Sequence, residues 1–559
     1  MNAILFISMI VGAAALLSWP LGRYMKWAMD PDPVSDGGAT GFFDRLFHLF
    51  GGRLTRESQN WKQYMVAMLV FNVVIFAVSF GLLALQQHLP LNPDGQKPIE
   101  HSLVFNTAAS FTTNTNLQHY SGESTLSYLS QLTLMWLQFV TPAVGLAALV
   151  AMARGLAGRK DMGNFFLDLQ RATFLVLLPL ALIVATLMVF GGMPMTLQGA
   201  AKVMTLEGIE QTIARGPVAA FLTIKQLGTN GGGFFGPNST HPLENPTFWT
   251  NVLSSFAIII VPMASVWMFG RIVGRIRHAA VVFGVMLLFL VLKIAGAVYF
   301  EQAPTQAFAA LPIEQNVGNL EGKELRFGTS AGPLWAVLTT STSNGSVNAM
   351  HDSLNPMTGL IPMIGMWLNT TFGGVGVGLI NMFLYIVLGV FIAGMMVGRT
   401  PEYLGRRIEA REVKLAVLAL FAHALLVLAP TALFAATDMG AKTVANVGPH
   451  GFSEILYEFS SANANNGSGF EGLGDNTVPW NVATGLVMLL ARFIPIILPL
   501  AIAGSLAAKR PAAQSVGTLG VEDGTFGLML FGTIVFVGAL TFFPAATLGP
   551  IAEHLQFMK

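Results

Sequence analysis

The chain has 559 residues, of which 53% are hydrophobic and only 11% are charged, and its net charge is +1 at pH 7. A soluble globular domain carries about 25% charged residues, so the composition excludes one and favours a polytopic helical membrane protein. The apolar stretches are continuous, which excludes a membrane β-barrel, and the near-zero net charge argues against a nucleic-acid partner. Because the chain has no cysteine, disulfides and thiolate metal sites are excluded as well.

Apolar runs long enough to cross a bilayer occur ten times along the chain. They are residues 3–22, 64–86, 131–152, 172–191, 250–271, 279–300, 360–398, 415–436, 482–507 and 526–548. The first run lacks the basic start and the small-residue cleavage site of a signal peptide, so we expect it to be a mature helix. The sequence therefore predicts an all-α polytopic membrane protein with ten transmembrane helices.

The basic residues divide unequally between the two sides of this topology. The loops 23–63, 153–171, 271–278, 399–414 and 508–525 hold 20 Lys and Arg residues, and the opposite side holds 8. The positive-inside rule predicts that the first set is cytoplasmic and that both termini lie outside. Acidic residues bring the outer side to −9 and the inner side to +8. A negative outer vestibule would concentrate cations.

A short polar motif recurs in the long outer loops after spans 2, 4, 6 and 8. The copies are Thr113-Asn114-Thr115-Asn116, Thr229-Asn230-Gly231-Gly232, Ser343-Asn344-Gly345-Ser346 and Asn465-Asn466-Gly467-Ser468. Aligned on Asn114, Asn230, Asn344 and Asn466, they are 116, 114 and 122 residues apart. Such regular spacing predicts four pseudo-symmetric repeats.

We divide the chain accordingly into repeats at 64–152, 153–271, 272–398 and 399–507. Residues 1–63 add an extra N-terminal helix and a cytoplasmic loop, and residues 508–559 add an extra C-terminal helix.

A semi-apolar segment precedes each motif and is too short to span the membrane. These segments are residues 101–112, 216–228, 332–342 and 451–462. We interpret them as re-entrant pore helices whose carbonyl ends, each carrying a partial negative charge, converge at mid-membrane and favour a cation. Carbonyls that replace a hydration shell are how potassium-selective filters work. The alternative is four ordinary outer turns rich in Asn and Gly.

The seventh run, from Leu360 to Gly398, has 39 residues. One unbroken helix of that length would be about 58 Å long against a membrane core of about 30 Å. The glycines at 373, 374, 376 and 378 indicate a break in the helix. The alternative is close helix packing through Gly374 and Gly378.

Several charged residues and histidines need separate interpretation. Arg492 lies about ten residues into its span, so we expect a water-filled cavity or a partner, with a structural ion pair as the alternative. Lys293 is interpreted as snorkelling or structural. The outer-loop histidines lack a metal-ligand spacing. The cluster Arg399, Arg406, Arg407 and Arg411 fits an orientation signal near anionic lipid or, alternatively, a docking surface for another subunit.

Beyond these patterns, the sequence closely resembles the potassium-binding A subunit family of the bacterial Kdp potassium-transporting P-type ATPase, within the superfamily of potassium transporters. The most specific stretches are SFTTNTNLQHYSGE (110–123), QLGTNGGGFFGPNSTHPLENP (226–246), TSTSNGSVNAMHDSLNP (340–356), GMMVGRTPEYLGRRIE (394–409) and ANNGSGFEGL (464–473). The resemblance implies the helix, pore loop, helix plan of potassium channels and of Trk, Ktr and HKT transporters, with two extra terminal helices.

The resemblance also implies roles for particular residues. The potassium filter would use Thr113, Asn114, Thr115, Thr229, Asn230, Gly231, Gly232, Ser343, Asn344, Gly345, Asn465, Asn466 and Gly467. The interrupted helix would act as a gating loop through Gly373, Gly374, Gly376 and Gly378, and Arg492 would sit in the pore below the filter. In this alignment the first copy has Thr115 where the others have Gly, which departs from exact fourfold symmetry.

The sequence contains no Walker loop and no Asp-Lys-Thr-Gly motif, and its cytoplasmic loops are too short for a nucleotide-binding domain. We therefore expect no catalysis and no bound nucleotide in this chain. The resemblance implies that K⁺ is the transported ion. The resemblance implies a catalytic B subunit, a single-span C subunit and a small F peptide as partners in the bacterial cytoplasmic (inner) membrane. The alternatives are a self-sufficient Trk-type potassium channel and a secondary transporter for an organic solute.

Overall fold

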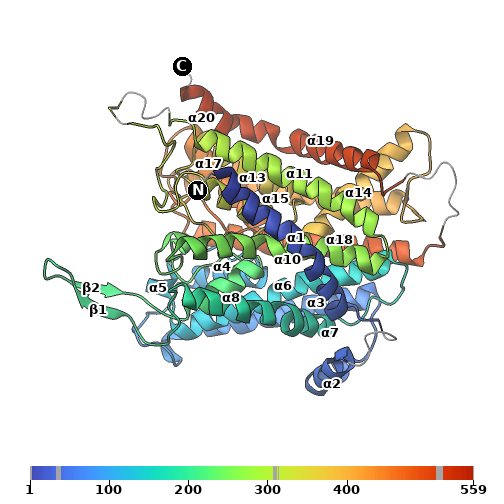
Figure 1. Cartoon of the computed structure of the whole chain (residues 1–559), viewed down its shortest axis with the longest axis horizontal. Coiled ribbons are helices and arrows are strands. Elements are labelled where there is room, and N and C mark those ends of the chain that lie inside the picture. Colours follow the sequence, from blue (N-terminus) through green and yellow to red (C-terminus); the bar gives the residue numbers. More distant parts are fainter. Residues whose placement is uncertain (1–2, 33–38, 306–310, 313, 512–519, 558–559) are drawn as a thin grey trace.

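The computed structural model describes residues 3–32, 39–305, 311–312, 314–511 and 520–557. Parts of the predicted cytoplasmic loops 23–63 and 508–525, and the C-terminal Lys559, lie outside the described residues. Within the described part, ten helices are long and apolar enough to cross a membrane, as predicted. They run side by side along the long axis of the molecule, and both termini lie at the same end (Figure 1).

The ten long helices are α1 (Ala3–Met29), α3 (Trp61–Ala84), α6 (Tyr128–Leu156), the continuous run Phe165–Phe190, α10 (Phe248–Val273), α11 (Ile276–Glu301), α14 (Val377–Met396), α15 (Ala410–Ala435), α18 (Val478–Ala508) and α19 (Gly524–Leu548). The run 165–190 consists of α7 (Phe165–Arg171), a π-helical turn (Ala172–Leu177) and α8 (Leu178–Phe190). Pro179, the second residue of α8, has no backbone N–H to donate, which fits the widened turn before it.

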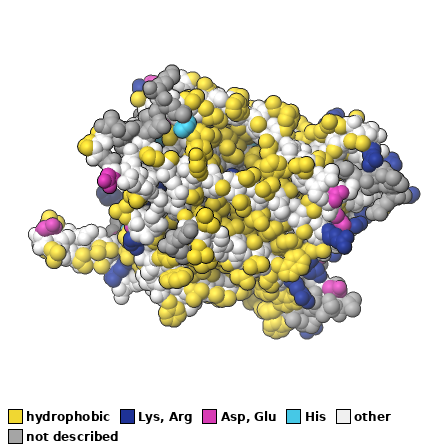
Figure 2. Space-filling view, turned by 45° about the horizontal axis from the view of Figure 1, so that its top comes forward, with side chains coloured by type: hydrophobic (Ala, Val, Ile, Leu, Met, Phe, Trp, Pro, Cys, Tyr) yellow, Lys and Arg dark blue, Asp and Glu magenta, His cyan; other side chains and the backbone are white. Residues whose placement is uncertain are grey.

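Burial divides the long helices into central and peripheral ones. In their most apolar windows α6 is 83% buried and α10 and α14 are 78% buried, whereas α1, α3 and α19 are 28% buried and α15 is 22% buried. The extra helix α1 packs along α10, and α19 packs against α11 and α14. Hydrophobic side chains cover the middle of the visible face and charged ones gather toward its ends (Figure 2). The peripheral helices thus present apolar faces to lipid or to partner helices.

Four short helices lie at the predicted re-entrant segments. They are α4 (His101–Thr112), α9 (Val218–Leu227), α12 (Ala331–Ser341) and α17 (Pro449–Asn463). Each ends at its polar motif. Glu100 caps the first of them by accepting from the backbone N–H groups of Ser102 and Leu103.

The seventh apolar run is broken, as predicted. Helix α13 (Pro356–Leu368) ends before residues 369–376, and α14 begins at Val377. Gly373 and Gly376 have φ of 58° and 79°, which favours glycine. A Cβ on Gly378 would lie 1.9 Å from the Phe372 carbonyl oxygen, so this glycine serves the fold of the break itself and not packing against a neighbouring helix.

The remaining elements lie at the two ends of the bundle. They are α2 (Ala39–Gly51), α5 (Gly122–Thr125), α16 (Asp438–Ala441), α20 (Pro550–Phe557), the 3-10 turns Gly52–Thr55, Gln86–His88 and Asn238–Thr240, and four short strands. Strands β1 (Ala201–Met204) and β2 (Glu210–Ile213) pair antiparallel with Ala201 opposite Ile213, and this hairpin projects from the molecule (Figure 1).

The second strand pair, β3 (Glu402–Tyr403) with β4 (Arg406–Arg407), changes the interpretation of the arginine cluster. Arg406 is buried and donates through Nη1 to the Leu506 and Lys509 carbonyls at 2.6 and 2.8 Å. It therefore satisfies the carbonyl end of α18, and neither lipid nor another subunit can use it.

Candidate ion pathway

The four short helices end in the same way. In each copy the backbone N–H of one motif residue donates to the carbonyl five residues earlier, at 2.9 Å. The pairs are Thr115 to Ser110, Asn230 to Lys225, Asn344 to Thr339 and Asn466 to Ser461. This repeated bond makes Thr115, Asn230, Asn344 and Asn466 equivalent positions.

Backbone angles give the same alignment. The residues just before these positions are left-handed: Asn114, Thr229, Ser343 and Asn465 have φ of 63°, 50°, 52° and 49°. The residues just after them are left-handed too: Asn116, Gly231, Gly345 and Gly467 have φ of 57°, 99°, 82° and 102°.

The predicted alignment of the first copy is therefore wrong by one residue. Thr115, and not Asn114, corresponds to Asn230, Asn344 and Asn466, and Asn116, and not Thr115, stands where the other copies have Gly. Asparagine adopts the left-handed region more readily than other residues with a side chain. The first copy therefore keeps the backbone fold of the others without a glycine.

The four copies meet in a closed ring. A Cβ on Gly231 would lie 1.8 Å from the Asn344 carbonyl oxygen, one on Gly345 would lie 2.1 Å from that of Asn466, and one on Gly467 would lie 2.2 Å from that of Thr115. Each glycine thus lies against the backbone of the next copy, and the fourth copy returns to the first. The three glycines allow this approach because they lack a side chain.

Side-chain amides connect neighbouring copies. Asn344 Nδ2 donates to the Lys225 carbonyl and Asn466 Nδ2 donates to the Thr339 carbonyl, both at 3.0 Å. Their Oδ1 atoms accept from the backbone N–H groups two residues later, Ser346 and Ser468, also at 3.0 Å. Each amide therefore fixes its own loop and the helix end of the preceding copy.

The first and second copies use different contacts. Thr115 Oγ1 lies 2.7 Å from Thr113 Oγ1 and accepts from Asn465 Nδ2 at 2.9 Å, which closes the ring. Asn114 Nδ2 donates to the Thr229 carbonyl at 3.1 Å. Gly232 is placed behind the ring, where its carbonyl accepts from Gln138 Nε2 at 3.0 Å. The structure thus brings the predicted filter residues of all four copies together.

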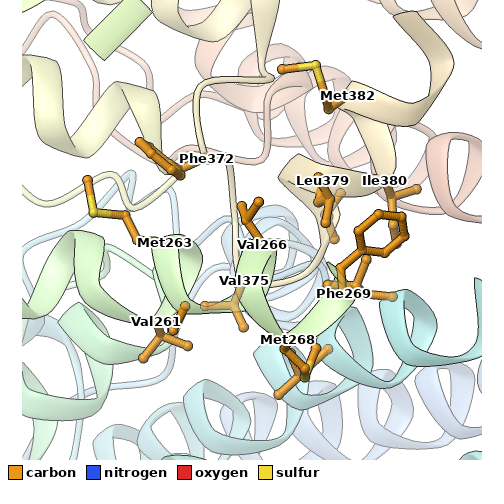
Figure 3. Close-up of a cluster of buried hydrophobic side chains, with 14 of the residues drawn as sticks. Val261, Met263, Val266, Met268, Phe269, Phe372, Val375, Leu379, Ile380 and Met382 are labelled. Atoms are coloured by element: carbon orange, nitrogen blue, oxygen red, sulfur yellow. The ribbon is translucent and has the colours of Figure 1, made fainter. Parts of the chain in front are cut away.

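The broken segment 369–376 crosses directly beneath the ring. The Gly373 N–H donates to the Ser341 carbonyl at 2.8 Å, the Val375 N–H donates to Thr229 Oγ1 at 3.0 Å, and Ser343 Oγ donates to Asn369 Oδ1 at 2.9 Å. Phe372 and Val375 enter a buried apolar cluster with Val261, Met263 and Val266 of α10 (Figure 3). Polar contacts above and apolar packing at the side hold this segment across the pathway.

Arg492 lies beside the same segment. It is 4% exposed, and its Nη2 donates to the Thr141 carbonyl at 3.2 Å. A Cβ on Gly145 would lie 2.4 Å from the Val375 carbonyl oxygen and 3.3 Å from Arg492 Nη2, so α6, the segment and the guanidinium meet at one point. Among the described residues no carboxylate lies within 4.0 Å of Arg492, which counts against the structural ion pair.

A cavity of about 30 Å³ connects the ring to Arg492, which is room for one or two waters. Asn114, Ser343 and Asn465 line it on the ring side, and Arg492, Asn381 and His423 line it further in, together with Asn369 and Gly374 of the broken segment.

Lys293 does not snorkel. Its Nζ donates to Ser341 Oγ at 2.7 Å, at the carbonyl end of α12, where a cation is favourable. Glu301 pairs instead with Lys323 at 2.5 Å. Another buried pair, Lys225 with Glu244, ties α9 to the loop after the second motif, and both side chains are 0% exposed.

On the other side of the ring lies a vestibule of about 500 Å³. Residues following all four motifs line it, including Leu117, Pro237, Val347 and Phe470. His119 and Asp475 belong to its wall, and His119 contacts Glu458 of α17. No sequence pattern points to this cluster, because His119 and Glu458 lie 339 residues apart and share no motif.

The four motifs meet in one ring, with the vestibule on one side of it and the small cavity on the other. Together with the ten long helices, this arrangement defines a multi-pass helical membrane protein. The chain belongs to the family described as potassium-transporting ATPase A subunit, whose model matches residues 8–555.

Curated relatives cover nearly the whole chain. A protein of Rhodospirillum centenum is 47% identical over 99% of this chain and 98% of its own length, and one of Geobacillus kaustophilus is 45% identical over 97% of both. Each is named potassium-transporting ATPase potassium-binding subunit. The solved structure of the potassium transporter TrkH from Vibrio parahaemolyticus is similar in fold, with a TM-score of 0.53 at 14% identity, over 89% of this chain and 98% of that one.

Proposed function

We propose that this chain is the non-catalytic, potassium-binding and translocating subunit of an ATP-driven potassium uptake complex. It selects K⁺ from the outer side and passes it to a P-type catalytic subunit. The closed ring carries this proposal, because backbone oxygens held by contacts between consecutive copies can replace the hydration shell of a monovalent cation. The names of the relatives, at 45 to 47% identity, support both the ion and the membership of an ATPase complex.

The filter in this proposal consists of the residues predicted for it in the four copies, with Asn116 added to the first copy. Residues 369–376 and Arg492 then form a barrier on the inner side of the filter. The barrier suits a subunit that must bind K⁺ without leaking it, since the gradient is maintained by its partner.

The proposal also includes an orientation and an assembly. The vestibule faces the outside of a bacterial cytoplasmic membrane, both termini are outside, and a catalytic B subunit, a single-span C subunit and an F peptide complete the complex. The 20 to 8 division of basic residues supports the orientation. The apolar helices α1, α3, α15 and α19, which are only 22 to 28% buried, offer the surface for lipid and partner helices.

The test of function compares the chain alone with the complex purified from its native membrane. We expect the complex to hydrolyse ATP when K⁺ is added and the chain alone in liposomes to show neither ATPase activity nor fast K⁺ flux. Fast, selective flux through the chain alone would overturn the proposal in favour of a self-sufficient Trk-type channel, the function that the fold of TrkH would otherwise suggest.

The orientation has its own test, because the chain has no native cysteine. Single cysteines at the exposed positions Ser124 and Glu207 should react with an impermeant thiol reagent added outside. A cysteine at the exposed Asp161 should react only after the membrane is opened. The reverse pattern would overturn the orientation and the placement of the vestibule.

A further inference from the structure

The vestibule wall contains a cluster that potassium selection does not require. His119 Nε2 lies 3.1 Å from Glu458 Oε1 and 3.8 Å from Asp475 Oδ2, and the three ligand atoms lie within 4.8 Å of one another. The side chains of His119 and Glu458 are 0% and 1% exposed, whereas that of Asp475 is 27% exposed toward the vestibule. One imidazole and two carboxylates therefore converge at a point that the outer solution can reach.

The orientation of the imidazole is fixed from behind. His119 Nδ1 lies 2.7 Å from Asn481 Oδ1. Asn481 Nδ2 donates to Ser102 Oγ at 3.0 Å and to Asn476 Oδ1 at 3.2 Å, so the amide presents its oxygen to the ring. Nδ1 must then carry a proton, and the lone pair of the neutral imidazole lies on Nε2, which faces the carboxylates. A histidine held through its other N–H by a carbonyl is the usual arrangement of a metal ligand.

We propose that His119 Nε2, Glu458 and Asp475 form a binding site for a divalent transition metal ion, with Zn²⁺ as its type. Three protein ligands and a fourth position open to vestibule water match the tetrahedral preference of Zn²⁺. The imidazole distinguishes the site from the all-oxygen ring, because nitrogen ligands favour Zn²⁺ over hard alkali cations.

A second group of three possible ligands, Asp352, His450 and Glu454, also has its ligand atoms within 4.8 Å of one another, but its histidine is held differently. His450 Nε2 lies 2.9 Å from Asp352 Oδ1 and its Nδ1 lies 2.8 Å from Glu553 Oε1. Both ring nitrogens are occupied by carboxylates, which suits a permanently charged imidazolium that ties α17 to α20. His450 does not line the vestibule and therefore provides a matched control.

Occupation of the site has a consequence that rests on the proposed function. His119 lies three residues after Asn116, and the vestibule that it lines also includes Gly345 and Gly467 of the ring. A dication bound there repels K⁺ that approaches the filter. External Zn²⁺ would then inhibit potassium uptake.

The test uses the full chain in detergent with Co²⁺ as the probe, because tetrahedral Co²⁺ absorbs strongly in the visible region and the chain has no thiolate to contribute a background. We expect one Co²⁺ per chain, displaced by Zn²⁺. His119→Ala and Asp475→Asn should abolish the absorption, Asn481→Ala should weaken binding by 10- to 100-fold, and His450→Ala should leave it unchanged.

Asp475 is the most exposed ligand, so Asp475→Asn tests the site even where His119→Ala fails to fold, and the melting temperature of each variant identifies that case. Absence of the absorption in the native chain, its survival in Asp475→Asn, or its loss in His450→Ala would each overturn the site. Inhibition of uptake is measured separately on the complex. Binding without inhibition would leave the site in place and overturn only its link to the proposed pathway.

Discussion

Arg492 donates to the main-chain carbonyl of Thr141, and the hydroxyl of the same threonine donates to Oδ1 of Asn114 in the ring at 2.9 Å. One residue of α6 thus connects Arg492 to the ring. The guanidinium is held by a carbonyl and not by a carboxylate, so its charge is left to act on an ion in the cavity between them.

Replacing Arg492 by Ala should increase passive potassium flux through the chain in liposomes. At a separation of ~6 Å and an effective dielectric of ~20, the repulsion between two unit charges is about 3 kcal/mol, which corresponds to roughly a hundredfold in rate. We expect an increase of 10- to 100-fold, and little change in Arg492→Lys, which keeps the charge. Arg271→Ala, at the end of α10 and stacked on Trp19, is the control. Equal flux in the native chain and in Arg492→Ala would refute the barrier.

The corrected alignment makes a prediction about Asn116. Because this residue stands at the glycine position with a φ of 57°, Asn116→Gly should retain potassium affinity and selectivity. Asn116→Val should lose both, since a β-branched side chain is strained in the left-handed region. Potassium and rubidium dependence of ATPase activity in the complex measures the effect. A damaging Asn116→Gly together with a harmless Asn116→Val would restore the alignment on Asn114.

Two glycines of the broken segment should respond differently to the same substitution. Gly376 has a φ of 79°, and a Cβ there would lie 2.2 Å from the Gly145 carbonyl oxygen, whereas the nearest side chain to a Cβ on Gly374 is 3.6 Å away. Gly376→Ala should displace the segment and raise passive flux several-fold, and Gly374→Ala should leave flux unchanged. Gly284→Ala, in α11 with open space around it, is a second control. Identical flux in all three variants would contradict a gating role.

Breaking the buried pair of Lys225 and Glu244 should lower the free energy of unfolding strongly, whereas replacing both residues by apolar ones should lower it little. Glu244→Gln leaves the ammonium unpaired at the end of α9, so we expect a loss of about 3 kcal/mol in the free energy of unfolding. Replacing both residues by apolar ones of similar size should recover most of this loss. Glu210→Gln in the exposed pair with Lys202 should cost less than about 1 kcal/mol. Thermal unfolding in detergent distinguishes these outcomes, and a double variant as unstable as the single one would count against the explanation.

Stability should fall as the pH rises from 7 toward 10. The pKa of His119 is about 9 in the folded chain and 6.5 in its ordinary state, because Asp475 and Glu458 outweigh the effect of burial. The charged imidazole therefore stabilises the fold fully below pH 6.5, and this contribution, up to about 3 kcal/mol, is lost as the pH passes 9. The difference in melting temperature between the native chain and His119→Gln, measured without added metal, should shrink over this range. A constant difference would contradict the charged state.

Much of the fold follows from local signals in the sequence. Hydropathy predicted ten spans, and nine of them match one long helix to within seven residues at each end, whereas the seventh, 360–398, divides into α13 and α14. The short apolar segments predicted the four short helices α4, α9, α12 and α17. The break near Gly373 followed from a run of glycines in a stretch too long for the membrane. These predictions succeeded because a bilayer leaves few solutions for an apolar backbone.

The details of the site depend on distant contacts, which local signals do not contain. Aligning the motifs on identical letters paired Asn114 with Asn230, whereas backbone angle makes Asn116 the partner of the glycines. His119 was interpreted as an ordinary loop residue because Glu458 is 339 positions away. Arg406 was assigned to the surface, although it caps α18. In each case the three-dimensional neighbour, and not the residue type, decides the role.

The ring also sets the order in which its contacts can form while the chain is synthesised and inserted. Its last joint runs from Asn465 to Thr115, a separation of 350 residues, and from Gly467 to the same threonine. In a nascent chain the first three copies are therefore made before the ring can close. Thr115 of the first copy lacks its contacts with Asn465 and Gly467 until the fourth copy has been synthesised. A chain that ends before residue 465 therefore lacks the fourth copy and cannot close the ring.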